Sequence, residues 1–261
     1  MEYKAVFLDI DGTILMPDHS YSASTVEAIK QLKAQDIHVF IATGRPLHEI
    51  FRLGAELGIE NYIGYNGASA IYEGKEIVHK PLDKQIIQQF LKMAKNKQHE
   101  MVLYTNRQNY FTAMDDPVTK AFIDTFQMKE NTRALDLTKA QILGVTLMKL
   151  QDADASEYEL TENIHLSQVN VPGMQHAYDV IRNNVNKGEA IKKVLQQLNL
   201  KKEQTIAFGD GMNDKEMLTI AGTGFAMGNA DPKLLPYASH RTTEVTEDGI
   251  FNGLKQLGLV R

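Results

Sequence analysis

Short apolar runs alternate with amphipathic segments at both ends of the chain. Residues 5–8 are a continuous apolar run, which is typical of a strand covered on both faces, and residues 38–42 predict a second buried strand. A helical period follows the first run, where Ser24 and Glu27 have the spacing of a capping box. The same alternation predicts a helix at 47–57, a strand at 62–65, a helix around 191–198, a strand at 205–208 and a helix around 217–221. Repeated strand–helix order predicts a Rossmann-like, doubly wound α/β sheet with mostly parallel strands.

The pattern changes in the middle of the chain. The elements predicted there are a helix at 86–94, a hairpin of 102–104 and 110–112, a helix after the Asp116–Pro117 pair, and strands at 144–150 and 164–171. This helix–hairpin–helix–strand order indicates an inserted α+β domain with its own sheet. We therefore expect a discontinuous core, residues 1–81 and 185–261, interrupted by a domain at 82–184.

Composition narrows the class of protein. The 261 residues are 43% hydrophobic and 23% charged, which favours a globular chain over a disordered one. A net charge of −5 lacks the basic surplus of nucleic-acid binding proteins. The absence of cysteine excludes disulfides and thiol catalysis. No apolar run approaches the ~20 residues of a membrane span, and the N-terminus lacks the features of a signal peptide, so we expect a soluble cytoplasmic protein without membrane or nucleic-acid partners.

Four polar segments follow predicted strands or begin predicted helices, at the edge where open α/β sheets bind ligands. They are residues 9–13, 43–45, 187–188 and 209–214. Each is rich in acids, hydroxyl groups or glycine at the point where an apolar strand stops or a helix starts.

The first and last of these segments supply carboxylates. Asp9 and Asp11 lie two residues apart, so both side chains share one face of a regular strand. Carboxylates so close repel each other unless a cation lies between them, and oxygen ligands without His or Cys favour Mg²⁺ over Zn²⁺. Asp210 and Asp214 follow another strand and could complete the site. The alternative is a turn with capping acids, which is what a single Asp-x-Asp-Gly segment most often is.

The other segments favour a phosphate group. Thr43 and Gly44 offer a hydroxyl and a close-approach backbone N–H. Lys187 is placed at a helix N-terminus, where the macrodipole disfavours a cation unless an anion is bound. Its replacement by methionine is therefore expected to cost the unliganded protein little stability. The alternatives are an ordinary turn at 43–44, a solvated surface lysine, and simple N-caps at Asn213 or Asp214.

Taken in order, the four segments resemble the signatures of the haloacid dehalogenase-like superfamily of phosphatases with an aspartate nucleophile. The matches are 9–13 for the first motif, Thr43 for the second, Lys187 for the third and 209–214 for the fourth. The Thr-Gly-Arg form, the Gly-Asp-Gly-Met-Asn-Asp form and the insertion between the second and third motifs resemble the Cof-type branch, which carries a large α/β cap. Residues 152–163 depart from that branch, because they are shorter and more acidic than the helix such caps usually carry.

The resemblance implies a role for each matching residue. Asp9 would be the nucleophile, and Asp11 would protonate the leaving oxygen and later activate water. Mg²⁺ would be held by Asp9, the backbone carbonyl of Asp11 and Asp210, with Asp214 supporting its water shell. The groups implied to bind the phosphoryl oxygens are the Ile10 backbone N–H, Thr43, Gly44, Lys187 and Asn213.

The expected protein is a Mg²⁺-dependent phosphoric monoester hydrolase acting on small phosphorylated metabolites, such as sugar phosphates or phosphorylated cofactors and their precursors. A phosphomutase of the same superfamily is an alternative, because it also uses paired aspartates. A non-catalytic phosphate sensor is a second alternative, which is disfavoured because a binder has no need of two carboxylates against a dianion. The sequence leaves the oligomeric state open.

Overall fold

The chain forms two compact units in the computed structural model, which describes residues 2–126, 128, 131–136, 141–169 and 171–261. The core unit comprises Met1–Arg45, Ile50–His79 and Asn186–Arg261, and the inserted unit comprises Pro46–Glu49 and Lys80–Val185. The domain limits expected from the sequence, 82–184, fall within the second unit. Among the described residues, no helix has both the length and the apolar character needed to cross a bilayer.

An eight-stranded sheet forms the centre of the core unit, in the order β14-β13-β12-β1-β2-β3-β4-β5. Its strands are β1 (Ala5–Leu8), β2 (His38–Ala42), β3 (Asn61–Gly64), β4 (Ser69–Tyr72), β5 (Lys75–His79), β12 (Thr205–Gly209), β13 (Thr223–Ala226) and β14 (His240–Arg241). Neighbours from β14 to β3 are parallel, and β3, β4 and β5 pair antiparallel. Strand β1 lies between β2 and β12, and all four of its side chains are buried, as expected for a strand covered on both faces.

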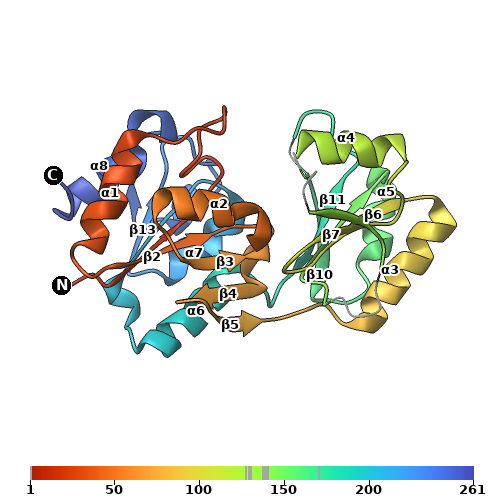
Figure 1. The fold of residues 1–261 in the computed structure, drawn as a ribbon, viewed down its shortest axis with the longest axis horizontal. Coiled ribbons are helices and arrows are strands. Elements are labelled where there is room, and N and C mark those ends of the chain that lie inside the picture. The colour runs from red at the N-terminus through yellow and green to blue at the C-terminus, as the bar shows by residue number, and fades with distance from the viewer. Residues whose placement is uncertain (1, 127, 129–130, 137–140, 170) are drawn as a thin grey trace. The chain divides into compact units, whose positions relative to one another are not determined.

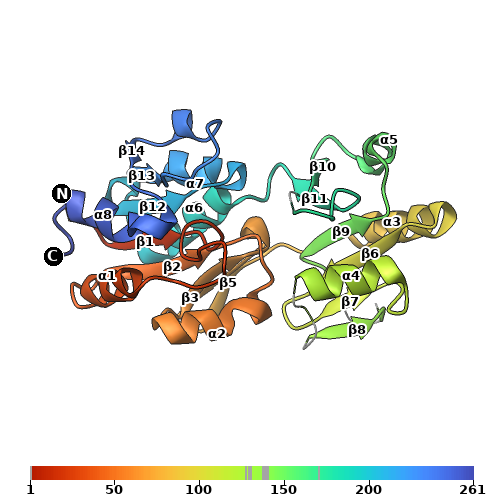
Figure 2. The ribbon, with the colours of Figure 1, turned by 90° about the horizontal axis from the view of Figure 1, so that it is seen from above.

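Helices cover both faces of this sheet (Figures 1 and 2). They are α1 (Ala23–Lys33), α2 (Leu47–Leu57), α6 (Lys187–Leu198), α7 (Lys215–Ile220) and α8 (Gly249–Gln256). On one face, Ile191 of α6 and Met217 of α7 pack in one buried cluster with Phe7 and Phe40 of the sheet. Helices α1 and α8 contact each other on the opposite face. This arrangement confirms the doubly wound α/β fold expected from the alternation of strands and helices.

The start of α1 differs from the prediction. Ser22 is the N-cap, and its Oγ accepts a hydrogen bond from the Thr25 backbone N–H at 3.2 Å. Ser24 lies inside the helix, where its Oγ donates to Asp248 Oδ1 at 2.5 Å. The capping box expected from Ser24 and Glu27 is therefore wrong, because a long-range partner engages the hydroxyl that would have capped the helix.

The inserted unit contains a six-stranded, mostly antiparallel sheet in the order β10-β11-β9-β6-β7-β8. Its elements are α3 (Lys84–Lys97), β6 (Glu100–Tyr104), β7 (Asn109–Phe111), α4 (Pro117–Thr125), β8 (Thr132–Ala134), β9 (Gly144–Met148), α5 (Asp152–Ala155), β10 (Ile164–Gln168) and β11 (Tyr178–Arg182). Phe90 of α3 and Phe122 of α4 anchor the two helices in separate buried clusters of this sheet. The predicted hairpin is confirmed as the antiparallel pair β6–β7. The predicted N-cap is also confirmed, since Asp116 Oδ1 accepts the Val118 backbone N–H at 2.8 Å.

The short acidic segment at 152–163 is held by one aromatic side chain. Tyr158 is fully buried, with its ring centroid 5.8 Å from that of Phe90. Its hydroxyl lies 2.9 Å from His99 Nδ1. Lys97 donates to Asp154 at 2.9 Å and to Glu157 at 2.6 Å, which accounts for two of the acids. Packing of one ring and a local ion-pair network thus replace a longer helix.

Replacing Tyr158 with alanine is expected to lower the free energy of unfolding of the inserted unit by about 3–5 kcal/mol, because it leaves a large cavity beside Phe90. The measurement is urea unfolding followed by far-UV circular dichroism. Tyr158→Phe is the matched control, since it keeps the ring and removes only the hydroxyl, at a cost of about 1 kcal/mol. Equal losses in the two variants would show that the hydrogen bond to His99, not the packing, anchors the segment.

Candidate active site

The carboxyl ends of β1 and β12 lie side by side, because Leu8 pairs with Phe208 in the parallel register. Asp9 directly follows β1, and Asp210 directly follows β12. Together with Asp214 they form an acidic group, whose three carboxylates each place one oxygen within 4.8 Å of the others. Residues from both ends of the sequence therefore meet at one edge of the sheet, where α/β folds bind ligands.

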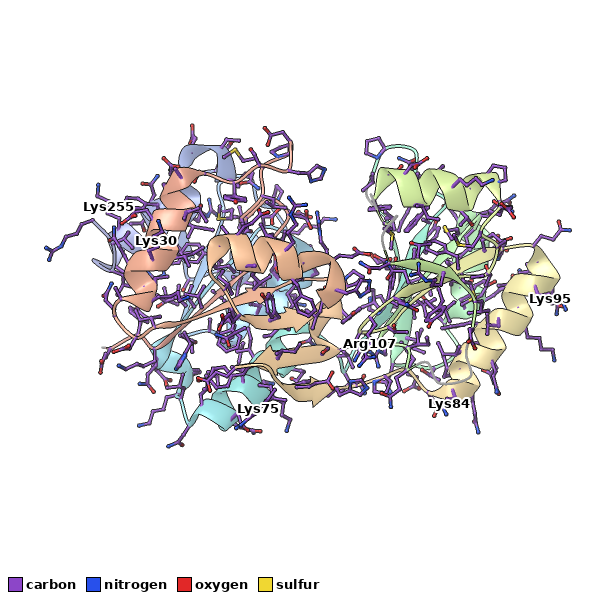
Figure 3. All side chains as sticks on the ribbon, in the orientation of Figure 1. Lys30, Lys75, Lys84, Lys95, Arg107 and Lys255 are labelled. Atoms are coloured by element: carbon purple, nitrogen blue, oxygen red, sulfur yellow. The ribbon has the colours of Figure 1, made fainter. Side chains whose placement is uncertain are left out.

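Lys187, the first residue of α6, lies inside this acidic group. Most lysines project from the surface, as Figure 3 shows for Lys30 on α1 and Lys255 on α8, whereas the side chain of Lys187 is 0% exposed. Its Nζ donates to Asp9 Oδ1 at 2.5 Å and to Asp214 Oδ1 at 2.6 Å. The alternative of a solvated surface lysine is therefore wrong.

Electrostatics in the acidic group favour an additional cation. Burial opposes the charge of Lys187, but the carboxylates of Asp214 and Asp9 outweigh it and raise the pKa of the ammonium. Burial, followed by the nearby charge of Asp214, raises the pKa of Asp9 well above its usual range. The same two causes raise the pKa of Asp210 to about 7. One ammonium does not balance three carboxylates, so a hard divalent cation would relieve the repulsion, and the all-oxygen donor set fits one.

Further hydrogen bonds hold Asp214 and Asp210 in place. Asp214 Oδ2 accepts the backbone N–H groups of Asp210 at 3.0 Å and Gly211 at 3.1 Å. Asp210 Oδ1 accepts a hydrogen bond from Thr13 Oγ1 at 3.1 Å. Gly12 allows the close approach of these two loops, since its φ is +81° and a Cβ there would lie 2.2 Å from Asp210 Oδ2.

The side chain of Asp11 lies outside the acidic group and pairs with Arg45. Arg45 Nε donates to Asp11 Oδ2 at 2.8 Å, and Nη2 donates to Oδ1 of the same carboxylate. This two-pronged contact fixes the orientation of the carboxylate. Arg45 was not predicted to have a role, although its place in the Thr-Gly-Arg segment at a sheet edge was the available signal.

The other predicted residues surround the same edge. The Ile10 carbonyl accepts the N–H groups of Thr13, Ile14 and Leu15 at 2.8–3.3 Å and so turns the chain away from the strand. Thr43 is 1% exposed, and its Oγ1 accepts the Arg45 backbone N–H at 3.1 Å. This hydrogen bond between Thr43 and Arg45 closes a tight turn around Gly44.

Asn213 contacts Asn66, a residue that was not predicted from the sequence. Asn213 lies in the 3₁₀ turn Met212–Asp214, and its Nδ2 donates to Asn66 Oδ1 at 3.3 Å. The same amide of Asn66 lies over Gly44, with Oδ1 3.1 Å from where a Cβ at Gly44 would be. The available signal was an Asn-Gly pair directly after a predicted strand.

Comparisons with known proteins cover nearly the whole chain. The family profile of the haloacid dehalogenase-like hydrolases matches residues 6–254. The protein named "Putative phosphatase YkrA" of Bacillus subtilis (strain 168) is 35% identical over 262 residues, which is 100% of each chain. HMP-PP phosphatase of Klebsiella pneumoniae (strain 342) is 29% identical, over 91% of this chain and 88% of that protein. The solved structure of the HAD subclass IIB sugar phosphatase BT4131 matches with a TM-score of 0.83 at 25% identity, over 98% of this chain and 100% of that one.

Proposed function

The chain belongs to the haloacid dehalogenase-like hydrolases and is a phosphatase, and on that premise we propose that it hydrolyses small phosphate monoesters through a phosphorylated Asp9. The observation that carries this proposal is the buried contact of Lys187 with Asp9 and Asp214. Charged groups buried together at a sheet edge, with strongly shifted pKa values, are typical of catalytic sites.

Asp9 is the nucleophile of the proposed mechanism. Lys187 donates to Oδ1 of Asp9, which leaves Oδ2 to attack phosphorus. In the first step a bond forms between Oδ2 and phosphorus while the bond from phosphorus to the leaving oxygen breaks. In the second step water attacks phosphorus, and inorganic phosphate leaves with the Asp9 carboxylate restored.

Asp11 moves the proton in both steps. It gives a proton to the leaving oxygen in the first step and takes one from the attacking water in the second. Arg45 orients both oxygens of the Asp11 carboxylate before substrate binds. One of these hydrogen bonds has to open for Asp11 to reach the leaving oxygen, and a phosphate dianion is a suitable competitor for the guanidinium.

Mg²⁺ is the metal that we propose for the acidic group. Asp9 and Asp210 would hold it together with the backbone carbonyl of Asp11. Both oxygens of Asp214 already accept hydrogen bonds, so Asp214 would support these ligands from behind. When bound, Mg²⁺ supplies a Lewis acid that neutralises charge on the phosphoryl oxygens.

The phosphate itself would be bound by groups from four separate segments. They are the Ile10 backbone N–H, Thr43, Gly44, Lys187 and Asn213. Backbone N–H groups and a lysine at the start of α6 suit an anion, because the helix macrodipole favours negative charge there.

Small phosphorylated metabolites are the substrates that we propose. One relative is named an HMP-PP phosphatase and one structural neighbour a sugar phosphatase, which supports phosphorylated cofactor precursors and sugar phosphates as candidate classes. The insertion at 82–184, which the resemblance identifies as a cap, is the part expected to select the organic group of the substrate.

The test is release of inorganic phosphate from a panel of sugar phosphates and phosphorylated cofactor precursors. We expect release with Mg²⁺, none with EDTA, and no recovery with Ca²⁺, which takes more ligands at longer distances than Mg²⁺. Total organic phosphate is measured in the same samples. If it stays constant while a phosphoryl group moves between positions, the protein is a mutase, and binding without turnover would show a sensor. Either result contradicts the hydrolase.

A further inference from the structure

The turn Tyr65–Gly67, between β3 and β4, has an unusual backbone. All three residues are left-handed, with φ of 52° at Tyr65, 51° at Asn66 and 98° at Gly67. Residues other than glycine adopt this region at a cost in free energy, and Tyr is a poor candidate for it. Such a conformation persists where surrounding contacts hold it, and strained residues of this kind cluster at functional sites. Three sets of contacts hold this turn.

The first contacts are with the Thr43–Arg45 segment. The Asn66 N–H donates to the Thr43 carbonyl at 3.1 Å, and the Tyr65 N–H donates to the Arg45 carbonyl at 3.2 Å. The side-chain amide of Asn66 covers Gly44, since a Cβ at Gly44 would lie 3.1 Å from Oδ1 and 3.2 Å from Nδ2. The turn is thus bonded to the backbone on both sides of Gly44.

The second contact is with the start of α6. A Cβ on Gly67 would lie 2.2 Å from the Asn186 carbonyl oxygen and 3.2 Å from the Lys187 backbone N. Asn186 is the N-cap of α6, so Gly67 packs directly against the helix start that carries Lys187. Any larger residue at position 67 would push the two segments apart.

The third contact is with the Met212–Asp214 turn. Asn213 Nδ2 donates to Asn66 Oδ1 at 3.3 Å, across 147 residues of sequence. One three-residue turn therefore contacts segments from three different parts of the chain.

We propose that Asn66 is a positioning residue for the phosphate group, acting through Gly44 and Asn213. Gly67 allows the turn to lie close to the start of α6, which carries Lys187. The inference rests on the proposed function for the identity of the ligand, and it adds a residue to which neither the family signatures nor the mechanism assign a role. The side chain of Asn66 holds the second and fourth motifs in register, so that donors from separate segments converge on one anion. Preorganised donors of this kind bind more tightly than donors that must be ordered on binding.

The variant that tests this is Asn66→Gly. Glycine keeps the left-handed backbone without strain and removes only the amide that contacts Gly44 and Asn213. Asn199→Gly is the matched control, because Asn199 is also left-handed, with φ of 52°, and lies at the other end of α6. Binding of inorganic phosphate in the presence of Mg²⁺ is measured by calorimetry. We expect the dissociation constant to rise about tenfold in Asn66→Gly and to stay within about twofold in the control.

Kinetics with p-nitrophenyl phosphate separate positioning from general destabilisation. We expect KM to rise in Asn66→Gly while the Mg²⁺ concentration for half-maximal activity stays the same, since the acidic group is untouched. The double variant Asn66→Gly/Asn213→Ala should weaken phosphate binding by less than the sum of the two single effects, because both act through one contact.

Three results with the variants would overturn the inference. They are phosphate affinity within twofold of the wild type in Asn66→Gly, an equal loss in Asn199→Gly, and additive effects in the double variant. A wild-type protein that binds phosphate but releases none from esters would contradict the proposed function and leave the binding comparison valid. A wild-type protein that does not bind phosphate would overturn the inference itself.

Discussion

Replacing Asp9 with asparagine is expected to abolish turnover while leaving the fold intact. Asparagine has nearly the same shape, but its amide oxygen does not attack phosphorus, so no phosphorylated intermediate forms. Loss of a covalent nucleophile lowers kcat by more than about 10⁴-fold. Lys187 keeps its second partner, Asp214, at 2.6 Å, so its charge stays compensated in the variant.

The measurement combines phosphate release with mass spectrometry of the acid-quenched enzyme. The wild type should carry one added phosphoryl group on the peptide that contains Asp9, and the variant none. Asp36→Asn is the matched control, because it makes the same chemical change at an exposed residue outside the site. Substantial Mg²⁺-dependent turnover in a folded Asp9→Asn variant would refute the covalent mechanism.

The fold of the core unit could be predicted because its central strands are buried on both faces. The runs at 5–8, 38–42 and 205–208, which are apolar except for His38 and Thr205, correspond to β1, β2 and β12 at the centre of the sheet. A strand covered on both faces needs a continuous apolar sequence, and few other elements produce one. Strands nearer the edge of the sheet carry a weaker signal.

The hairpin β4–β5 at one edge of the core sheet was not predicted from the sequence. Strand β5 contains Lys75 and Glu76, and its burial pattern is mostly exposed or intermediate. The turn between the strands has left-handed backbone at Glu73 and Gly74, with φ of 48° and 73°. Two-residue hairpin turns are usually recognised in a sequence by Asn-Gly or Asp-Gly. Here the first position is glutamate, so the sequence does not indicate the turn.

The acidic group could be predicted, whereas the Arg45–Asp11 pair and the role of Asn66 beside it could not. Residues that directly follow parallel strands converge at one edge, so the sequence places Asp9 near Asp210 without tertiary detail. The pairing of Arg45 with Asp11 depends on the direction of a long side chain, which sequence position does not determine. Asn66 acts through its backbone conformation and one amide, and neither produces a charge or hydropathy pattern.

Lys187→Met is expected to lower the stability of the metal-free protein substantially, whereas the sequence alone predicted little loss. The sequence shows a cation at a helix N-terminus, which the macrodipole disfavours by less than about 1 kcal/mol. The structure shows that the ammonium is fully buried between Asp9 and Asp214. Its removal leaves two buried carboxylates without compensation, which typically costs about 3–5 kcal/mol. Turnover should fall as well, because the nucleophile and the bound phosphate lose their nearest positive charge.

Thermal unfolding in EDTA and in Mg²⁺ measures this effect. Stabilisation by Mg²⁺ should be larger in Lys187→Met than in the wild type, since the cation restores part of the lost charge balance. Lys192→Met is the matched control on the same helix, where a half-exposed pair with Glu189 contributes little. Adding Asp9→Asn to Lys187→Met should recover part of the lost stability, because it removes one of the uncompensated carboxylates. An unchanged melting temperature in EDTA would mean that the ammonium does not hold the acidic group together. The small macrodipole penalty on a cation at the helix N-terminus would then describe Lys187 correctly.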